Sequence, residues 1–143
     1  MDIKISKGIV KEALKKESSL ISKGAYSDKG VNLYDTIYID EQEFDLLSSA
    51  YDDALSTIVS LMREFFTSNP TTSGDTVTFS LWKSDAGLVA ALADDIHSYI
   101  AKRMMTQWLR TVYPTESLQY ENAASNVLSN ISLKLYHKNP PTR

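Results

Sequence analysis

The sequence contains no cysteine. A disulfide framework, a thiolate metal site and a thiol nucleophile are therefore excluded, and the absence fits an intracellular protein without requiring one. No run of about 18 apolar residues occurs either, so no membrane-spanning helix is predicted. The opening residues Met1-Asp2-Ile3-Lys4 lack a continuous apolar segment and a small-residue cleavage site. We therefore predict no signal peptide.

Histidine is also scarce, with only His97 and His137 in 143 residues. Asp94 and His97 lie three residues apart on one face of a predicted helix, a spacing that metal ligands use. A di-metal carboxylate bundle, however, repeats such a pattern on two helices and adds further glutamates. We therefore expect no metal site. His97 is expected to be a hydrogen-bonding residue at the surface or between helices.

Motifs of common catalytic sites and of nucleotide-binding loops are absent as well. Two pairs of adjacent carboxylates occur, Asp52-Asp53 and Asp94-Asp95. Neighbouring residues on a helix point about 100° apart, so neither pair converges on one substrate. Residues 80–83 match the Ser-x-x-Lys motif of some serine enzymes. In those enzymes the nucleophilic serine lies at the start of a helix, whereas Ser80 lies on a predicted strand. The sequence therefore predicts no enzyme, no cofactor and no small-molecule substrate.

What the sequence does contain is the composition of an ordinary globular domain, with 43% apolar and 23% charged residues. The length predicts one domain over residues 1–143, and we expect residues 1–5 and 138–143 to be flexible ends. A net charge of −3 disfavours nucleic-acid binding over the whole surface.

The charges are unevenly distributed along the chain. Residues 30–62 carry acids without a Lys or Arg, whereas no acid follows Glu121. Two interpretations are open. The helices present a solvated surface of mixed charge, or copies of the chain meet head to tail, with an acidic face against basic ends.

Four segments show the apolar periodicity of helices: residues 5–23, 41–66, 86–112 and 116–136. The segment Ala86–Val112 is the longest and has the broadest apolar surface, so we expect the other helices to surround it. Ser6 is a candidate N-cap of the first helix, and Gly24 is a candidate stop. The predicted core consists of Phe44, Leu47, Tyr51, Ile58, Leu92, Ile96, Ile100, Trp108, Val127, Leu128 and Ile131.

One segment predicts a strand. Residues 76–82 alternate apolar and polar side chains, with Val77, Phe79 and Leu81 on one side. Residues 67–75 before it have the composition of a loop. The partner of the strand is either residues 36–39 of the same chain or a strand of another copy. The predicted fold class is mainly α, a four-helix bundle-like domain with a short two-stranded β element.

The two ends of the chain carry a resemblance. The opening Ile5-Ser6-Lys7-Gly8 before a lysine-rich helix, and the ending from Leu133 to Arg143, resemble a family of short proteins encoded in tailed-phage and prophage genomes. The acid-capped second helix and the aromatic-rich third helix are similar too, so the likeness spans most of the chain in layout.

This resemblance implies a head–tail connector or head-completion component, many of which are small helical bundles that assemble into rings. Such a protein acts through contacts with other proteins, as a homo-oligomer or with other virion components. Its location is the host cytoplasm or the virion. The alternative is a small intracellular helical interaction or regulatory module without a viral role.

The sequence departs from this family at the tail, where His137 and Asn139 stand in place of basic residues. The departure argues against direct contact with nucleic acid and favours docking to a protein. Candidate partner-binding residues therefore lie on the predicted strand and on the C-terminal segment. They are Val77, Phe79, Leu81, Tyr136, Lys138, Pro140, Pro141 and Arg143.

Overall fold

The computed structural model describes residues 2–29, 41–81, 86–112 and 114–136. In chain order they form β1 (Asp2–Ser6), α1 (Lys7–Lys29), α2 (Glu41–Leu46), α3 (Ser48–Met62), a 3-10 turn (Arg63–Phe65), β2 (Thr71–Ser73), β3 (Thr76–Ser80), α4 (Ala86–Val112) and α5 (Pro114–Tyr136). The chain is mainly helical, as predicted. None of the helices in these ranges has the length and apolar character needed to cross a membrane.

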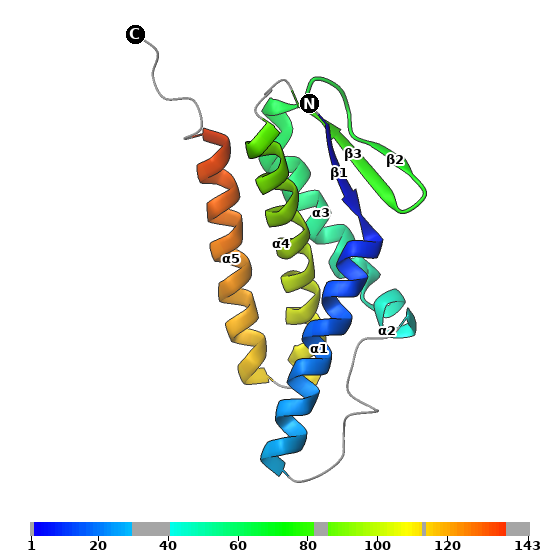
Figure 1. The fold of residues 1–143 in the computed structure, drawn as a ribbon, viewed down its shortest axis with the longest axis vertical. Coiled ribbons are helices and arrows are strands. Elements are labelled where there is room, and N and C mark those ends of the chain that lie inside the picture. Colours follow the sequence, from blue (N-terminus) through cyan, green and yellow to red (C-terminus); the bar gives the residue numbers. More distant parts are fainter. Residues whose placement is uncertain (1, 30–40, 82–85, 113, 137–143) are drawn as a thin grey trace.

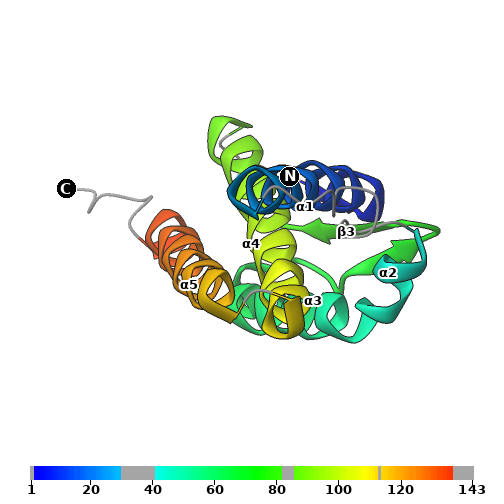
Figure 2. The same ribbon diagram turned by 90° about the horizontal axis from the view of Figure 1, so that it is seen from below.

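Helix α4 has the predicted bounds and lies in the middle of the molecule. α1, α3 and β1 pack against it on one side, and α5 runs along it on another (Figures 1 and 2). Leu92, Ile96 and Ile100 of α4 are completely buried. Burying one such side chain is worth about 1.5–3 kcal/mol, so contacts to α4 provide much of the hydrophobic stabilisation.

The β element differs from the prediction, because it has three antiparallel strands in the order β1-β3-β2 rather than two. Residues 36–39, one of the predicted partners, lie outside the described ranges. The predicted strand pairs within the chain, with β2 on one side and with the N-terminal strand β1 on the other, where Ile3 lies opposite Phe79 and Ile5 lies opposite Val77.

Residues 2–5 are therefore part of the core rather than a flexible end. Ile3 and Ile5 are 1% and 0% exposed, whereas Asp2 and Lys4 between them point to solvent. The physical reason is the alternation of polar and apolar side chains, which matches the period of a strand. The first helix begins at Lys7, two residues later than predicted.

Strand β3 falls in the predicted strand 76–82, but it forms a hairpin with β2, which lies in the segment 67–75 that was predicted as a loop. Ser73 lies opposite Thr76, which leaves Gly74 and Asp75 as a two-residue turn. Gly74 has φ of 60°, as the first central residue of a type II′ turn requires. All three residues of β2 are exposed, so a polar loop sequence is compatible with this edge strand.

The junction of β1 and α1 is held by hydrogen bonds. The Ser6 Oγ accepts from the backbone N–H of Gly8 at 3.2 Å, which confirms Ser6 as the helix cap. The backbone N–H of Lys7 donates to the carbonyl of Asp75 at 3.0 Å and so ties α1 to the hairpin turn. At its other end α1 continues through Gly24 to Lys29, so the predicted stop at Gly24 is wrong.

The predicted second helix is divided at Leu47. This residue has φ of −95° and ψ of 10°, and its N–H donates to the carbonyl of Phe44 at 3.0 Å in a tighter turn. Helix geometry resumes at Ser48. Phe44, Leu47 and Tyr51 nevertheless remain buried, as their spacing predicts.

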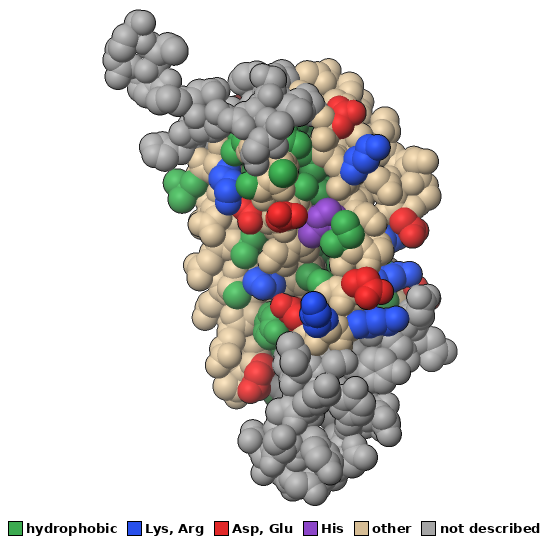
Figure 3. All heavy atoms as spheres, in the orientation of Figure 1, with side chains coloured by type: hydrophobic (Ala, Val, Ile, Leu, Met, Phe, Trp, Pro, Cys, Tyr) green, Lys and Arg blue, Asp and Glu red, His purple; other side chains and the backbone are tan. Residues whose placement is uncertain are grey.

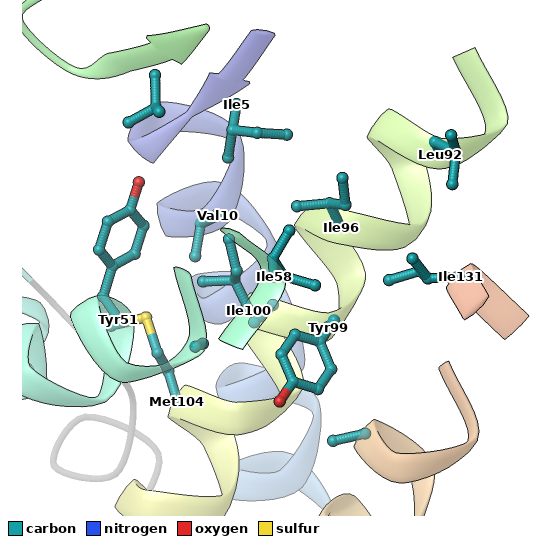
Figure 4. Packing of buried hydrophobic residues seen from close by; sticks show 14 of the residues in the cluster. Ile5, Val10, Tyr51, Ile58, Leu92, Ile96, Tyr99, Ile100, Met104 and Ile131 are labelled. Atoms are coloured by element: carbon teal, nitrogen blue, oxygen red, sulfur yellow. The ribbon is translucent and has the colours of Figure 1, made fainter. Parts of the chain in front are cut away.

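The core joins side chains from all the long helices and from the sheet. In Figure 4, residues of α1, α3, α4 and α5 converge, with Ile58 and Ile100 near the centre of the view. Of the eleven predicted core residues, nine are buried and two, Val127 and Leu128, are half-buried. Both exceptions belong to α5, which packs chiefly against α4. A closed four-helix bundle is not confirmed.

Candidate functional site

The apolar face of β3, predicted to bind a partner, is occupied by the chain's own core. Val77, Phe79 and Leu81 are 7%, 0% and 2% exposed, and the Phe79 ring lies 5.2 Å from that of Phe66. The alternation was identified correctly, but the face packs inward against helices. These three residues therefore offer no surface to a second molecule in this fold.

The remaining predicted partner-binding residues lie at the C-terminus. Tyr136 is the last residue of α5, and only its backbone position is described. Lys138, Pro140, Pro141 and Arg143 lie outside the described ranges. Docking by the tail thus stays a prediction.

The structure instead presents a groove between α1 and α4, which we call the α1–α4 groove. Its volume is about 540 Å³. Its residues come from one face of α1, from one face of α4 and from β1. They are Lys4, Ile9, Ala13, Glu17, Ala90, Ala93, Asp94, His97, Ser98, Ala101 and Lys102. Figure 3 looks onto this side of the molecule, where hydrophobic, acidic, basic and histidine side chains lie close together.

Helical spacing explains why these residues share the groove. Ile9, Ala13 and Glu17 follow one another at four-residue steps along α1, and the α4 residues recur at steps of three and four. Small side chains predominate on the α4 side, so the two helices leave space between them. Ile9 is 53% exposed at the edge of this space, which is unusual for an isoleucine in a packed helix.

Both ring nitrogens of His97, a polar residue of the groove, have hydrogen-bond partners. Its Nε2 accepts a hydrogen bond from the backbone N–H of Ser6 at 3.0 Å, and its Nδ1 lies 2.8 Å from the carbonyl of Ala93. These partners require the neutral tautomer with the proton on Nδ1. Burial lowers the pKa of His97, opposed by the hydrogen bond to Ala93 and the charge of Asp94. His97 is thus a hydrogen-bonding residue, as expected, but it is buried and joins helix α4 to strand β1 rather than to another helix.

At the lower end of the groove three helices meet through charged and aromatic groups. The Lys102 ammonium lies 3.9 Å from Glu17 Oε1 and 5.9 Å from the centre of the Tyr120 ring on α5. The second oxygen of Glu17 is buried and has no hydrogen-bond partner among the described residues. Burial therefore raises the pKa of Glu17, and the nearby Lys102 opposes this.

These groups are engaged in holding the fold together. Both nitrogens of His97 are used by backbone groups, so neither can bind a metal or move a proton without breaking a hydrogen bond. Within the described ranges, no group of three or more His, Asp or Glu residues could hold a metal ion. What the groove offers is a concave surface with an apolar part and with acidic and basic side chains in equal number.

Sequence reasoning did not identify this groove. Of its α4 residues, only Asp94 and His97 were considered in the sequence, and then as a pair that metal ligands could use rather than as part of a groove. The available signal was the row of small residues Ala90, Ala93 and Ala101 opposite the larger apolar stripe of the same helix. Such a row lets another backbone approach closely, but only the crossing of α1 and α4 shows that the space is left open.

The sequence and the structure were also compared with known proteins. No family model matches the sequence, no curated protein matches it, and no solved structure matches the fold.

Proposed function

We propose that this chain is a non-catalytic assembly protein, a head–tail connector or head-completion component of a tailed phage, that acts through protein–protein contacts. The observation that supports the proposal is the α1–α4 groove, an open concave surface beside an exposed isoleucine. The resemblance of the two chain ends to small phage proteins points in the same direction. On this proposal the protein works in the host cytoplasm or within the virion.

The charges of the groove favour a protein partner over nucleic acid. Lys4 and Lys102 contribute two positive charges, and Glu17 and Asp94 contribute two negative charges, so their formal sum is zero. Binding to nucleic acid requires a surplus of basic groups, because much of the affinity arises when Lys and Arg side chains replace the counterions along the phosphate backbone. A neutral, partly apolar groove is better matched by an uncharged helix or extended segment of a partner protein.

The alternative, a helical interaction or regulatory module without a viral role, would use the same groove. The two functions differ in the neighbouring genes and in the effect of deletion. A connector gene lies beside capsid, portal or tail genes, and its deletion leaves full heads and separate tails in electron micrographs. A lysate with normally joined particles after deletion contradicts the connector function.

Complementation of that deletion then tests the groove itself. Ala90→Trp places a large side chain in the groove from an exposed position on α4, so the fold should persist. Ser56→Trp, at an exposed position on α3, is the matched control. We expect the control to restore joined particles and Ala90→Trp to reduce their number at least tenfold. Full restoration by Ala90→Trp shows that the groove is not the contact.

A further inference from the structure

The upper half of the α1–α4 groove carries four exposed side chains, which we call the upper groove. They are Lys4 of β1, Ile9 of α1, and Ala90 and Asp94 of α4. Lys4 and Ile9 belong to one wall, and Ala90 and Asp94 belong to the other. The other lining residues are buried or half-buried. The upper groove is thus the part of the groove that a second molecule reaches most easily.

The charges of the two halves of the groove differ. In the lower half, the Lys102 ammonium lies 3.9 Å from Glu17 Oε1, so each charge has a partner within the chain. In the upper groove, Lys4 and Asp94 form no ion pair with any residue of the described ranges. A charge that is buried without a partner is strongly unfavourable. A molecule that covers the upper groove therefore has to bring an acid to Lys4 and a base to Asp94.

The shapes of the two walls differ as well. Ile9 is 53% exposed at the edge of the groove, whereas the α4 wall presents the small side chains of Ala90 and Ala93. Covering an exposed isoleucine is favourable in proportion to the apolar area removed from water. The upper groove thus combines a projecting apolar side chain with an apolar hollow on the same surface.

These features are complementary to themselves under a two-fold rotation. The segment β1–α1 runs in the same direction as α4 (Figure 1), and the hydrogen bond between Ser6 and His97 aligns the two. Along this direction Lys4 and Ala90 come first, and Asp94 and Ile9 follow. A two-fold axis through this surface reverses the direction and exchanges the walls. Lys4 of one copy then faces Asp94 of the other, Ile9 faces Ala90, and each contact occurs twice.

We propose that the upper groove is a self-association surface on which two copies of the chain pair about a two-fold axis. Lys4 of each copy is neutralised by Asp94 of the other, and Ile9 of each copy lies on the alanines of the other. The inference rests on the proposed function, because it names a second copy as the protein that occupies the groove. Four side chains of each copy form the centre of this contact, whereas a standard interface has about 20–30 residues a side. We therefore expect a weak dimer that dissociates on dilution.

Sedimentation velocity over a wide range of concentrations tests the charge pairs. Wild type should pass from monomer to dimer as the concentration rises. Lys4→Glu and Asp94→Lys should each raise the dissociation constant about tenfold, because like charges then meet at both contacts. The double variant restores opposite charges between copies and should dimerise nearly as well as wild type. Lys15→Glu, at an exposed position of α1 outside the groove, is the matched control and should leave the dissociation constant unchanged.

Two results of this experiment overturn the proposal. One is a wild type that stays monomeric at every concentration. The other is a double variant that dimerises no better than the single variants, because the charges would then not meet between copies.

Disulfide trapping tests the arrangement, because the chain has no cysteine of its own. A mixture of Ile9→Cys and Ala90→Cys chains should give a cross-linked dimer under mild oxidation, since these positions face each other between copies. Each variant alone should not cross-link, because its two identical positions lie on opposite sides of the axis. A mixture of Ile9→Cys with Ser56→Cys, at an exposed position on α3, is the control. Equal cross-linking in the control mixture overturns the proposed pairing.

The complementation experiment separates this inference from the proposed function. If the purified chain stays monomeric and Ala90→Trp still fails to restore joined particles, self-association is wrong and the groove binds another virion protein. If the chain dimerises through the upper groove and Ala90→Trp restores joined particles fully, self-association is confirmed and the groove is not the connector contact.

Discussion

Helices α4 and α5 follow each other in the chain and have similar lengths, 27 and 23 residues, yet their environments differ. α4 is covered by α1, α3, β1 and α5, and its buried residues recur from Leu92 to Leu109. α5 rests chiefly on α4 and buries one narrow face that includes Ala124, Ile131 and Leu135. A helix between several neighbours buries a broad apolar surface, whereas one at the edge leaves much of its surface exposed.

Specific polar contacts compensate in part for the smaller buried face of α5. The Ser117 Oγ donates a hydrogen bond to the carbonyl of Thr106 at 3.0 Å, and Lys134 pairs with Asp95. These contacts hold α5 to α4 near its two ends. Replacing residues of the two helices measures how much the central and the edge positions differ in their contribution to the free energy of unfolding.

The largest effect is expected for Ile100→Ala. Ile100 is completely buried, and truncating such a residue usually lowers the free energy of unfolding by about 2–5 kcal/mol. Ile131→Ala on α5 should cost less, because fewer elements surround the cavity. Chemical denaturation of both variants measures the difference. If Ile100→Ala lowers the free energy of unfolding less than Ile131→Ala does, the central helix does not contribute more to stability than the edge helix.

The next effect concerns His97 on α4. His97→Ala leaves the half-buried backbone N–H of Ser6 without its acceptor. A fully buried donor that loses its partner costs about 1–3 kcal/mol, so we expect a loss at the lower end of this range. His97→Gln, which retains polar atoms, should recover part of this loss. Equal stability of the alanine variant and wild type would show that the bond between α4 and β1 contributes little.

The same residue makes stability depend on pH. Because burial lowers the pKa of His97, the unfolded chain takes up a proton near the ordinary value of 6.5, before the folded chain does. Stability should therefore fall as the pH drops from about 6.5 towards the lower pKa of the folded state. Denaturation at about pH 7.5 and about pH 5.5 should show a smaller decrease for His97→Gln than for wild type. A similar decrease in both assigns the pH dependence to other groups.

A smaller loss is expected for Ser117→Ala, which removes the hydrogen bond between the start of α5 and Thr106 of α4. One buried hydrogen bond contributes about 1 kcal/mol. Amide hydrogen exchange should rise first in the initial turns of α5 and leave the protection of α4 unchanged. A rise that is equal in both helices would mean that α5 does not open separately.

The smallest effect is expected for Leu133→Ala. Leu133 is 60% exposed, and surface changes usually alter stability by no more than about 0.5 kcal/mol. Chemical denaturation of this variant beside wild type measures the change. A large loss would show that Leu133 packs within its own chain.

Much of the helical part of the fold is predictable because it depends on local periodicity. The bounds of α4 follow from its apolar spacing and from Pro114, and Ser6 caps α1 as its side chain allows. The division of α2 and α3 at Leu47 was not predicted, since the apolar spacing continues across it. The prediction that α1 ends at Gly24 was wrong, because a glycine permits the left-handed conformation that ends a helix but does not require it.

The candidate sites were harder to predict. The alternation of Val77, Phe79 and Leu81 is visible in the sequence, but nothing local says whether that face meets the chain's own helices or another molecule. Residues 122–133 of α5 carry no charge, and only the structure shows which of them are exposed.

By itself the sequence determined where the long helices lie, which of their residues are apolar, and that β3 is a strand, because these properties depend on neighbours within a few residues. Only the tertiary structure decided that β1 pairs with β3, that α1 and α4 leave a groove between them, and that α5 lies at the edge. These features arise from contacts between distant segments. Ser6 and His97, for instance, are 91 residues apart, and no local pattern specifies such a pair.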